Sequence, residues 1–481
     1  MLSAQPCVPT SYLELNARSR PEAPALVDGD LVMSFGQLRE RVHAAAAALV
    51  DRGVQAGDVV AVSLPNVWEY VALELAVPLL GAVLLPLPLT LGDAERRRSL
   101  ALTGASQVID EGEAERLCSA PFRGPLEPPP ADPARVVEIA LTSGTTGAPK
   151  LASLHAGLKQ ATFEAFTSRL DVAPVDRVLI MSPVTQGIGG MCLYCLRAGA
   201  SLVMLRERRF TAEHALRTAA SSHATLLVGV PTNVIRMLDS PALADADLSA
   251  ARCTAVAGAP MPPEVSRAWE SLTGSLVCVF YGSMDAGQLA VGSPGDPREK
   301  RWTTVGRPHE CAEVMVTAGG EICMRGPMVQ ERYWGEARGP YSDDGWVHMG
   351  DLGFVDGDGY LHITGRIKDL VIRGGANINP HEVEAALRSH PAVADVCVVG
   401  RPDRELGERA VAFAVARRPL TLEEVRKHLE GHGLARYKWP EFLELVDEIP
   451  VAGPGKADRR LLAERAAEAA RTEPTAENVT T

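Results

Sequence analysis

One segment rich in hydroxyl groups and glycine has the residue types of a phosphate-binding loop. It runs Thr142-Ser143-Gly144-Thr145-Thr146-Gly147 and continues through two further residues to Lys150. Such a loop offers main-chain N–H and side-chain O–H donors, followed by a cation, and together these suit a polyphosphate. It is not a Walker-type P-loop, because no glycine directly precedes Lys150 and no Ser or Thr follows it. A polar surface turn explains a short run of this kind but not the whole segment.

Further polar and glycine-rich motifs follow in order along the chain. They are Gly258-Ala259-Pro260, Tyr281-Gly282-Ser283-Met284-Asp285, Gly350-Asp351, Gly365-Arg366-Ile367-Lys368, Arg373-Gly374-Gly375 and Gly453-Pro454-Gly455-Lys456. Taken with the first segment, this ordered set resembles the adenylate-forming superfamily, which contains acyl- and aryl-CoA synthetases, nonribosomal adenylation domains and luciferases. The resemblance extends from about Ser11 to Leu462.

The resemblance implies a nucleotide-binding site for ATP. The phosphates would lie in the loop formed by Thr142, Ser143, Gly144, Thr145, Thr146 and Gly147, with Lys150 beside them. The base would lie against Gly258, Ala259, Pro260, Tyr281, Gly282 and Ser283, with the Tyr281 ring stacked on adenine. Asp351 would accept the ribose hydroxyls, and Arg366 would reach the ribose or a phosphate.

The resemblance also implies catalytic and conformational roles. Lys456 would neutralise charge while a carboxylate attacks the α-phosphate, and Asp285 would ligate Mg²⁺. Lys368 would be the hinge about which a small domain rotates between two poses. Gly374 and Gly375 would line a tunnel for the thiol arm of coenzyme A.

Several positions differ from the family pattern. Met284 replaces a threonine that would donate to phosphate, and Asp285 replaces a longer glutamate. Gln186 stands where many relatives have a histidine, and Gly187 and Gly190 leave room beside it. Gln186, Gly187, Gly190 and Met284 are therefore the predicted substrate pocket, and a flexible glycine-rich turn is the alternative. The space suggests an aryl or cyclic acid.

These residues predict a two-step ligase that uses ATP, Mg²⁺ and coenzyme A. A carboxylic acid and ATP give an acyl-adenylate and pyrophosphate, and coenzyme A then takes the acyl group. Transfer to a carrier protein is an alternative, as is adenylation of nitrite to diazotise an aromatic amine. A non-catalytic nucleotide-binding protein is the alternative outside the enzymes, although it would have no use for Lys456.

Composition limits the remaining function classes. The chain has 481 residues with 46% hydrophobic residues, which excludes a disordered chain. A net charge of −12 without a basic face argues against nucleic acid as a partner. The nine cysteines favour buried, reduced thiols in a cytoplasmic protein. The longest apolar stretch, 71–92, contains Glu74 and three prolines, so no membrane span is expected. A homodimer is an open option for the oligomeric state.

Alternating helix and strand signals predict an α/β protein that positions these motifs. A capping box from Ser34 to Gln37 predicts a helix over 38–50, and an apolar strand over 136–141 leads into the phosphate loop. We expect a large N-terminal domain over 1–365, with parallel or mixed sheets flanked by helices and a β-rich subdomain after about Gly306. A small mobile α+β domain would occupy 366–481, with its hinge near Lys368.

Overall fold

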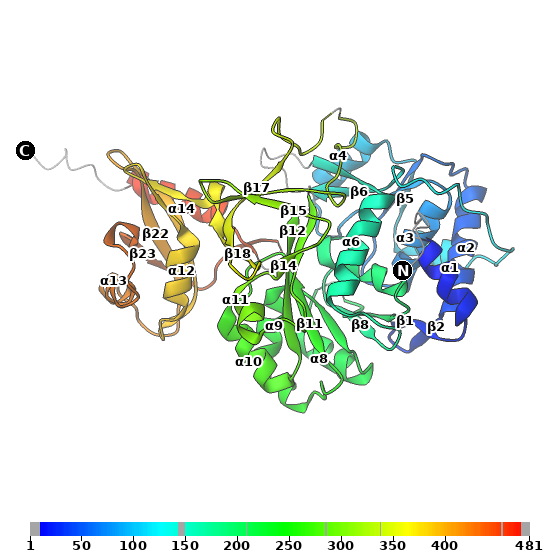
Figure 1. Cartoon of the computed structure of the whole chain (residues 1–481), viewed down its shortest axis with the longest axis horizontal. Coiled ribbons are helices and arrows are strands. Elements are labelled where there is room, and N and C mark those ends of the chain that lie inside the picture. Colours follow the sequence, from blue (N-terminus) through cyan, green and yellow to red (C-terminus); the bar gives the residue numbers. More distant parts are fainter. Residues whose placement is uncertain are drawn as a thin grey trace, which may run out of the picture. The chain divides into compact units, whose positions relative to one another are not determined.

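The computed structural model describes residues 10–142, 150–207, 209–283, 286–336, 338–453 and 456–472. The chain divides into two compact units (Figure 1). The first comprises Met1–Met315, Cys323–His348 and Asp356–Leu361, and the second comprises Val316–Ile322, Met349–Val355 and His362–Thr481. The second unit therefore contains all of the predicted small domain and two shorter stretches. A hinge near Lys368 stays a prediction.

The largest sheet of the first unit has nine strands in the order β14-β13-β12-β11-β10-β8-β9-β1-β2. They are β1 (Pro24–Asp28), β2 (Leu31–Ser34), β8 (Arg177–Ile180), β9 (Ser201–Met204), β10 (Leu226–Gly229), β11 (Cys253–Ala257), β12 (Leu276–Ser283), β13 (Gly287–Val291) and β14 (Arg307–Pro308). The neighbours β9, β8, β10, β11 and β12 are parallel. Their carboxyl ends therefore meet at one edge, where open α/β sheets bind ligands.

A second sheet of this unit has five strands in the order β5-β3-β4-β6-β7. They are β3 (Val59–Val62), β4 (Val83–Pro86), β5 (Gln107–Ile109), β6 (Val136–Thr142) and β7 (Lys150–His155). β6 and β7 pair antiparallel, with Thr142 opposite Lys150. The two ends of the predicted phosphate loop are therefore held side by side.

Helices pack against the two sheets of this unit. They are α1 (Thr10–Ser19), α2 (Phe35–Asp51), α3 (Trp68–Leu79), α4 (Asp93–Thr103), α5 (Glu111–Cys118), α6 (Ala156–Arg169), α7 (Gly187–Met191), α8 (Ala212–Ser221), α9 (Pro231–Leu238), α10 (Pro263–Thr273) and α11 (Arg298–Thr303), with short 3₁₀ turns η1 (Cys192–Leu196) and η2 (Pro241–Asp245). Trp269 of α10 and Met237 of α9 share one core with Leu227 and Val277 of the sheet. Helices α2 and α3 share another core with strands of both sheets.

Four strands form the predicted β-rich subdomain in the order β15-β16-β17-β18. They are β15 (Glu313–Val316), β16 (Glu321–Arg325), β17 (Val347–Val355) and β18 (Leu361–Arg366). The predicted α/β architecture with this subdomain is confirmed.

The C-terminal part of the second unit is built on the long antiparallel pair β21 (Val393–Asp403) and β22 (Gly407–Ala416). Its other elements are η3 (Ile367–Asp369), β19 (Val371–Arg373), β20 (Ala376–Ile378), α12 (Pro380–Arg388), α13 (Leu422–Gly431), η4 (Arg436–Lys438), β23 (Phe442–Leu445), β24 (Val451–Gly453), β25 (Lys456–Ala457) and α14 (Arg459–Thr472). Residues of α12 and α13 share one core with this sheet, and Leu462 of α14 packs in a different core with Phe413.

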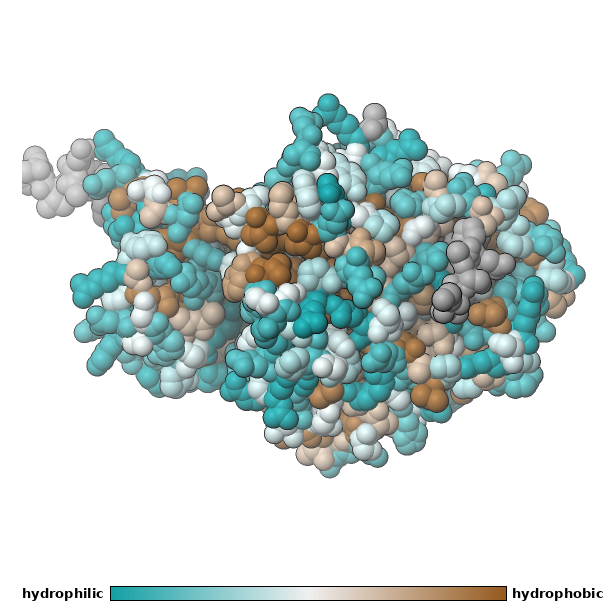
Figure 2. Space-filling view, in the orientation of Figure 1, coloured by the Kyte–Doolittle hydropathy of each residue, from teal (hydrophilic) through white to brown (hydrophobic). Residues whose placement is uncertain are grey.

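One face of the molecule is mostly hydrophilic (Figure 2). Hydrophilic residues cover most of the face drawn in Figure 2, and hydrophobic residues form smaller groups among them. Within the described ranges, no helix is both long enough and apolar enough to cross a bilayer.

Candidate active site

The predicted adenine-binding residues lie together at the carboxyl edge of the large sheet. Gly258, Ala259 and Pro260 directly follow β11, and Tyr281, Gly282 and Ser283 end the neighbouring parallel strand β12. Gly258 has a φ of +87°, which a side chain would strain, so the chain turns sharply away from the strand there. A Cβ at Gly282 would lie 2.3 Å from the main-chain oxygen of Gly287. The close approach of the paired strand β13 therefore leaves no room for a side chain at Gly282.

The predicted substrate-pocket segment leaves the same sheet edge after β8. Gln186 is exposed and precedes α7, which Gly187 begins with a φ of +43°. A Cβ on Gly189 would lie 2.1 Å from the main-chain oxygen of Pro183, and one on Gly190 would lie 3.1 Å from that of Val184. Tight backbone packing thus accounts for part of the glycine-rich sequence. Only β10 separates β8 from β11, so at the usual strand spacing this segment begins about 10 Å from the adenine-binding residues.

Asn66, which sequence reasoning missed, fixes this segment. The residue lies between β3 and α3 and is 7% exposed. Its Nδ2 donates to the main-chain oxygens of Ser182 (2.9 Å) and Ile180 (3.3 Å), and its Oδ1 accepts from the Val184 N–H (2.9 Å). One buried amide therefore holds three main-chain groups of the pocket segment. Because the residue lies more than a hundred positions away, no local sequence signal marks it.

The ends of the phosphate loop are described although residues 143–149 are not. Lys150 begins β7, and its Nζ lies 4.6 Å from the ring centre of Tyr333 and 3.5 Å from the Tyr333 hydroxyl. Ala152 forms a bridge with Tyr333, and the Leu151 oxygen accepts from the Trp334 N–H at 2.7 Å. The segment around Tyr333 therefore orients Lys150 at the foot of the loop.

In the second unit, Asp351, predicted to bind the ribose, forms an ion pair with Arg366, predicted to reach the ribose or a phosphate. Arg366 Nε lies 2.8 Å from Asp351 Oδ1, and the Asp351 side chain is 7% exposed while that of Arg366 is 43% exposed. Asp351 belongs to β17 and Arg366 ends β18. The structure thus brings both predicted residues together, with the carboxylate more buried than the arginine.

The predicted hinge and tunnel residues lie in two short turns of the same unit. Lys368 is exposed in the 3₁₀ turn η3. Gly374 and Gly375 connect β19 to β20 with φ of +55° and +82°. A two-residue hairpin turn with two positive φ angles favours glycine at both positions, so the turn itself accounts for both residues. A role in a thiol tunnel stays a prediction.

Lys456 lies on a small hairpin next to the last helix. It starts β25, where its backbone pairs with Gly453 of β24, and α14 begins at Arg459. Met284, Asp285 and the loop residues Ser143, Gly144, Thr145, Thr146 and Gly147 lie outside the described residues, as do the side chains of Thr142 and Lys456.

A buried ionic cluster supports the strand that leads into the phosphate loop. Lys159 Nζ lies 3.1 Å from Glu74 Oε1 and also contacts Glu138 of β6, and the side chains of Lys159 and Glu74 are each 6% exposed. Burial alone would lower the pKa of Lys159, but the charges of Glu138 and Glu74 raise it well above its usual value. Burial raises the pKa of Glu74 despite the nearby Lys159. The cluster joins α3, β6 and α6.

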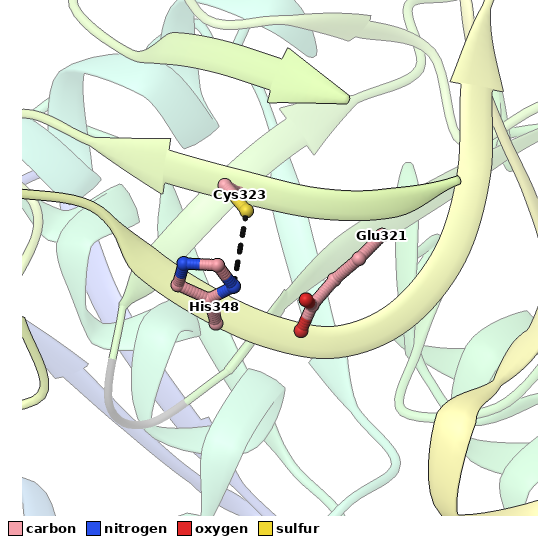
Figure 3. A group of neighbouring side chains, drawn as sticks. All are labelled: Glu321, Cys323 and His348. Carbon is pink, nitrogen blue, oxygen red and sulfur yellow. Dashed lines mark hydrogen bonds between the residues drawn. The ribbon is translucent and has the colours of Figure 1, made fainter. Parts of the chain in front are cut away.

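Cys323 and His348 form a second polar contact on β16 and β17 (Figure 3). The Cys323 thiol lies 3.5 Å from His348 Nδ1, and His348 Nε2 lies 3.1 Å from Asp344 Oδ2. Glu321 shares β16 with Cys323. Thiol, imidazole and carboxylate groups are common metal ligands, but the thiol here is buried and already hydrogen-bonded. We therefore interpret the pair as packing between strands.

A histidine and a cysteine pair that could suggest chemistry have structural roles here. His155 caps α6, because its Nδ1 accepts from the Leu158 N–H at 3.1 Å. Cys192 and Cys195 are both buried, and burial raises the pKa of each thiol. Their CxxC spacing therefore belongs to the core.

Comparison with known proteins agrees with this arrangement. The sequence model of the AMP-binding enzyme family matches residues 13–334, and that of the AMP-binding enzyme C-terminal domain matches residues 382–456. The chain belongs to the AMP-binding enzymes. Its relatives are named coenzyme A ligases and synthases, so the predicted enzyme class, an AMP-forming acid–thiol ligase, is confirmed.

Two relatives and one solved structure match this AMP-binding enzyme over nearly their whole length. It is 34% identical to a propanoyl:CoA ligase of Mycobacterium tuberculosis, over 94% of this chain and 97% of that protein. The name of that ligase gives its acyl group a 7a-methyl-1,5-dioxo-octahydroindenyl ring system. This chain is 33% identical to feruloyl-CoA synthase from an Amycolatopsis species, over 92% and 95%. Among solved structures, o-succinylbenzoate CoA synthetase from Bacillus subtilis, in complex with its acyl-adenylate intermediate, is 27% identical with a TM-score of 0.82, covering 96% and 98%.

Proposed function

We propose that this AMP-binding enzyme converts an aryl or cyclic carboxylic acid into its coenzyme A thioester through an acyl-adenylate. One observation carries the proposal: the segments predicted to bind adenine and the acid leave the same edge of one parallel sheet, about 10 Å apart by strand spacing. A nucleotide and an acid bound there would lie close enough to react. The ring-containing acids in the names of the two relatives above support the substrate class.

In the first step, a carboxylate oxygen attacks the α-phosphorus of MgATP and pyrophosphate leaves. Tyr281 and residues 258–260 bind the base, Asp351 and Arg366 bind the ribose, and Thr142 to Gly147 with Lys150 bind the phosphates. Asp285 offers the oxygen donors that Mg²⁺ prefers and would hold that ion, which neutralises phosphate charge when bound. Lys456 stabilises the charge that develops at the reacting phosphate.

In the second step, the thiol of coenzyme A attacks the acyl carbonyl and AMP leaves. Gly374 and Gly375 would pass the thiol arm along their backbone, and Lys368 would be the pivot between the two steps. Gln186, Gly187, Gly190 and Met284 would form the acid pocket. A cytoplasmic location and self-association also stay predictions.

The test is pyrophosphate release from MgATP with a panel of aryl, cyclic and fatty acids and with nitrite plus an aromatic amine, each with coenzyme A, with a carrier protein or with neither. Release with a ring-containing acid, together with formation of its coenzyme A thioester, is the expected result. Release only with fatty acids would refute the substrate class. Release only with nitrite and an aromatic amine would favour diazotisation, and thioester formation only on a carrier protein would replace coenzyme A as acceptor. ATP binding without turnover on any acid would favour a non-catalytic protein.

A further inference from the structure

A partly buried network of charged side chains lies in the C-terminal part of the second unit, apart from the residues assigned above. Its centre is Arg459, the first residue of α14, whose side chain is 19% exposed. Arg459 Nη2 donates to Glu384 of α12 at 2.8 Å, and the Glu384 side chain is 1% exposed. Arg459 Nη1 donates to the Val398 oxygen of β21 at 2.7 Å. One guanidinium therefore joins the start of α14 to a helix and to the central sheet.

The same network reaches the predicted hinge. Arg459 Nε lies 3.5 Å from Asp369 Oδ2, and Asp369 ends η3, the turn that contains Lys368. His381 of α12 bridges both acids, since its Nε2 lies 3.6 Å from Asp369 Oδ2 and its Nδ1 lies 3.3 Å from Glu384 Oε2. The hinge turn, α12 and the start of α14 are thus held by one set of ionic contacts.

The cationic partners of the network keep its two acids ionised. Burial alone would raise the pKa of Glu384, but His381 and Arg459 hold it below its usual value. Asp369 behaves in the same way, because burial would raise its pKa but the hydrogen bond from His381 and the charge of Arg459 outweigh that effect. Both acids are therefore ionised at neutral pH, and Arg459 contacts both of them. Removing Arg459 would leave two carboxylates in the interior of the unit without their main cation.

Lys456 precedes Arg459 by three residues, a distance of at most about 10 Å along an extended chain. The intervening backbone is also fixed, since Asp458 N–H donates to the Pro450 oxygen at 2.6 Å and Asp458 Oδ1 accepts from the Leu461 N–H at 3.0 Å. The position of the Arg459 backbone therefore restricts where the backbone of Lys456 can lie.

We propose that Arg459 is a positioning residue for Lys456, and that Glu384 and Asp369 hold it so that the lysine hairpin moves together with the hinge turn. The inference rests on the proposed function, because it assumes that Lys456 acts in adenylation. Arg459 acts through the lysine and not on the substrate. It determines where the lysine arrives when the unit adopts its adenylating pose.

The chain provides a matched control in the next residue. Arg460 is 80% exposed and pairs with Glu464 one turn later at 3.0 Å, on the surface of the same helix. We would compare Arg459→Met with Arg460→Met in two separate assays: pyrophosphate release with acid and MgATP, and thioester formation from supplied acyl-adenylate and coenzyme A. Thermal melting and far-UV circular dichroism would show that each variant is folded at the assay temperature.

We expect Arg459→Met to slow adenylation by about 100-fold, since a displacement of about 1 Å at a catalytic group can have that effect. Thioester formation, which does not use Lys456, is expected to change at least tenfold less, and Arg460→Met is expected to stay within about twofold of the wild type in both assays. Equal losses in both steps, or equal behaviour of the two arginine variants, would overturn the proposal.

If Arg459→Met does not fold, Glu384→Gln supplies the same test with a nearly isosteric change. Its control is Glu382→Gln, because Glu382 is on the same helix but is exposed and pairs with Lys438. The same split between the two steps is expected for Glu384→Gln and not for Glu382→Gln. No split in either variant would refute the inference.

A double variant separates this inference from the proposed function. In a Lys456→Ala background, Arg459→Met should lower the remaining adenylation rate by less than about twofold, because the residue through which it acts is gone. A further loss as large as in the wild type would contradict the inference alone. Wild-type protein that adenylates no acid, or Lys456→Ala that adenylates normally, would instead contradict the proposed function.

Discussion

The buried cluster of Lys159, Glu74 and Glu138 allows a quantitative prediction for the variant Lys159→Met. The substitution keeps most of the side-chain volume but leaves two carboxylates, 6% and 14% exposed, without their cation. Removing one partner of a buried ionic group typically destabilises a protein by about 3–5 kcal/mol. At about 1.4 kcal/mol per tenfold change, the ratio of folded to unfolded protein should fall by a factor of about a hundred to a few thousand.

The sign of the pH dependence provides an independent check. Burial already raises the pKa of Glu74 in the presence of Lys159, and loss of the lysine charge should raise it further. Protonated Glu74 is less costly to bury than ionised Glu74. The destabilisation caused by Lys159→Met should therefore be largest above neutral pH and should shrink as the pH falls toward about 5.

Urea denaturation of both proteins between about pH 5 and pH 8 would measure the difference in the free energy of unfolding. The double variant Lys159→Met with Glu74→Gln should recover part of the loss, because it removes one of the two uncompensated charges. A loss below about 1 kcal/mol, or one that does not change with pH, would refute the reasoning from burial.

Three further changes test other contacts. Asn66→Ala leaves the Val184 N–H without its partner, which should cost about 1–3 kcal/mol of stability. Steady-state kinetics should show a larger rise in KM for the acid than in KM for ATP. Equal rises in the two KM values would contradict the role assigned to Asn66. His381→Asn should flatten the pH dependence of thermal melting. Burial would lower the pKa of His381, but hydrogen bonds to Asp369 and Glu384 raise it, so its contribution is complete below about pH 6.5 and is lost as pH rises through the higher folded value; an unchanged profile would exclude this. Gly374→Ala should lower the free energy of unfolding by about 1 kcal/mol, because the φ of Gly374 is +55°. Gly431→Ala is the control and should not lower it, since the φ of Gly431 is not positive and an added Cβ would meet no atom within 4 Å. Thermal melting of both variants would measure the difference.

Local sequence signals predicted the elements well where neighbouring residues determine them. The capping box expected from Ser34 to Gln37 is present in the structure and begins α2. The helix expected over 38–50 extends over Phe35–Asp51, because the box residues themselves start it. The strand expected over 136–141 is β6, one residue longer.

Contacts between distant residues were not predictable from these signals. Strands β21 and β22 continue to Asp403 and from Gly407, because pairing with each other stabilises residues that have no strand pattern of their own. The network around Arg459 joins residues up to ninety positions apart in the sequence, and the amide of Asn66 holds a segment of the other sheet. Ordered motifs predicted the site, but the residues that hold those motifs in place became visible only in three dimensions.

The way in which Asn66 holds the predicted acid-pocket segment bears on how this enzyme can acquire new substrates. Its partners are main-chain groups of Ile180, Ser182 and Val184, which every residue type except proline at the donor position supplies equally. Side chains such as Thr185 and Gln186 can therefore be exchanged without loosening the anchor. Substrate preference and the stability of the pocket wall are thus controlled by different atoms, so libraries that vary Thr185 and Gln186 should remain largely folded while the preferred acid changes.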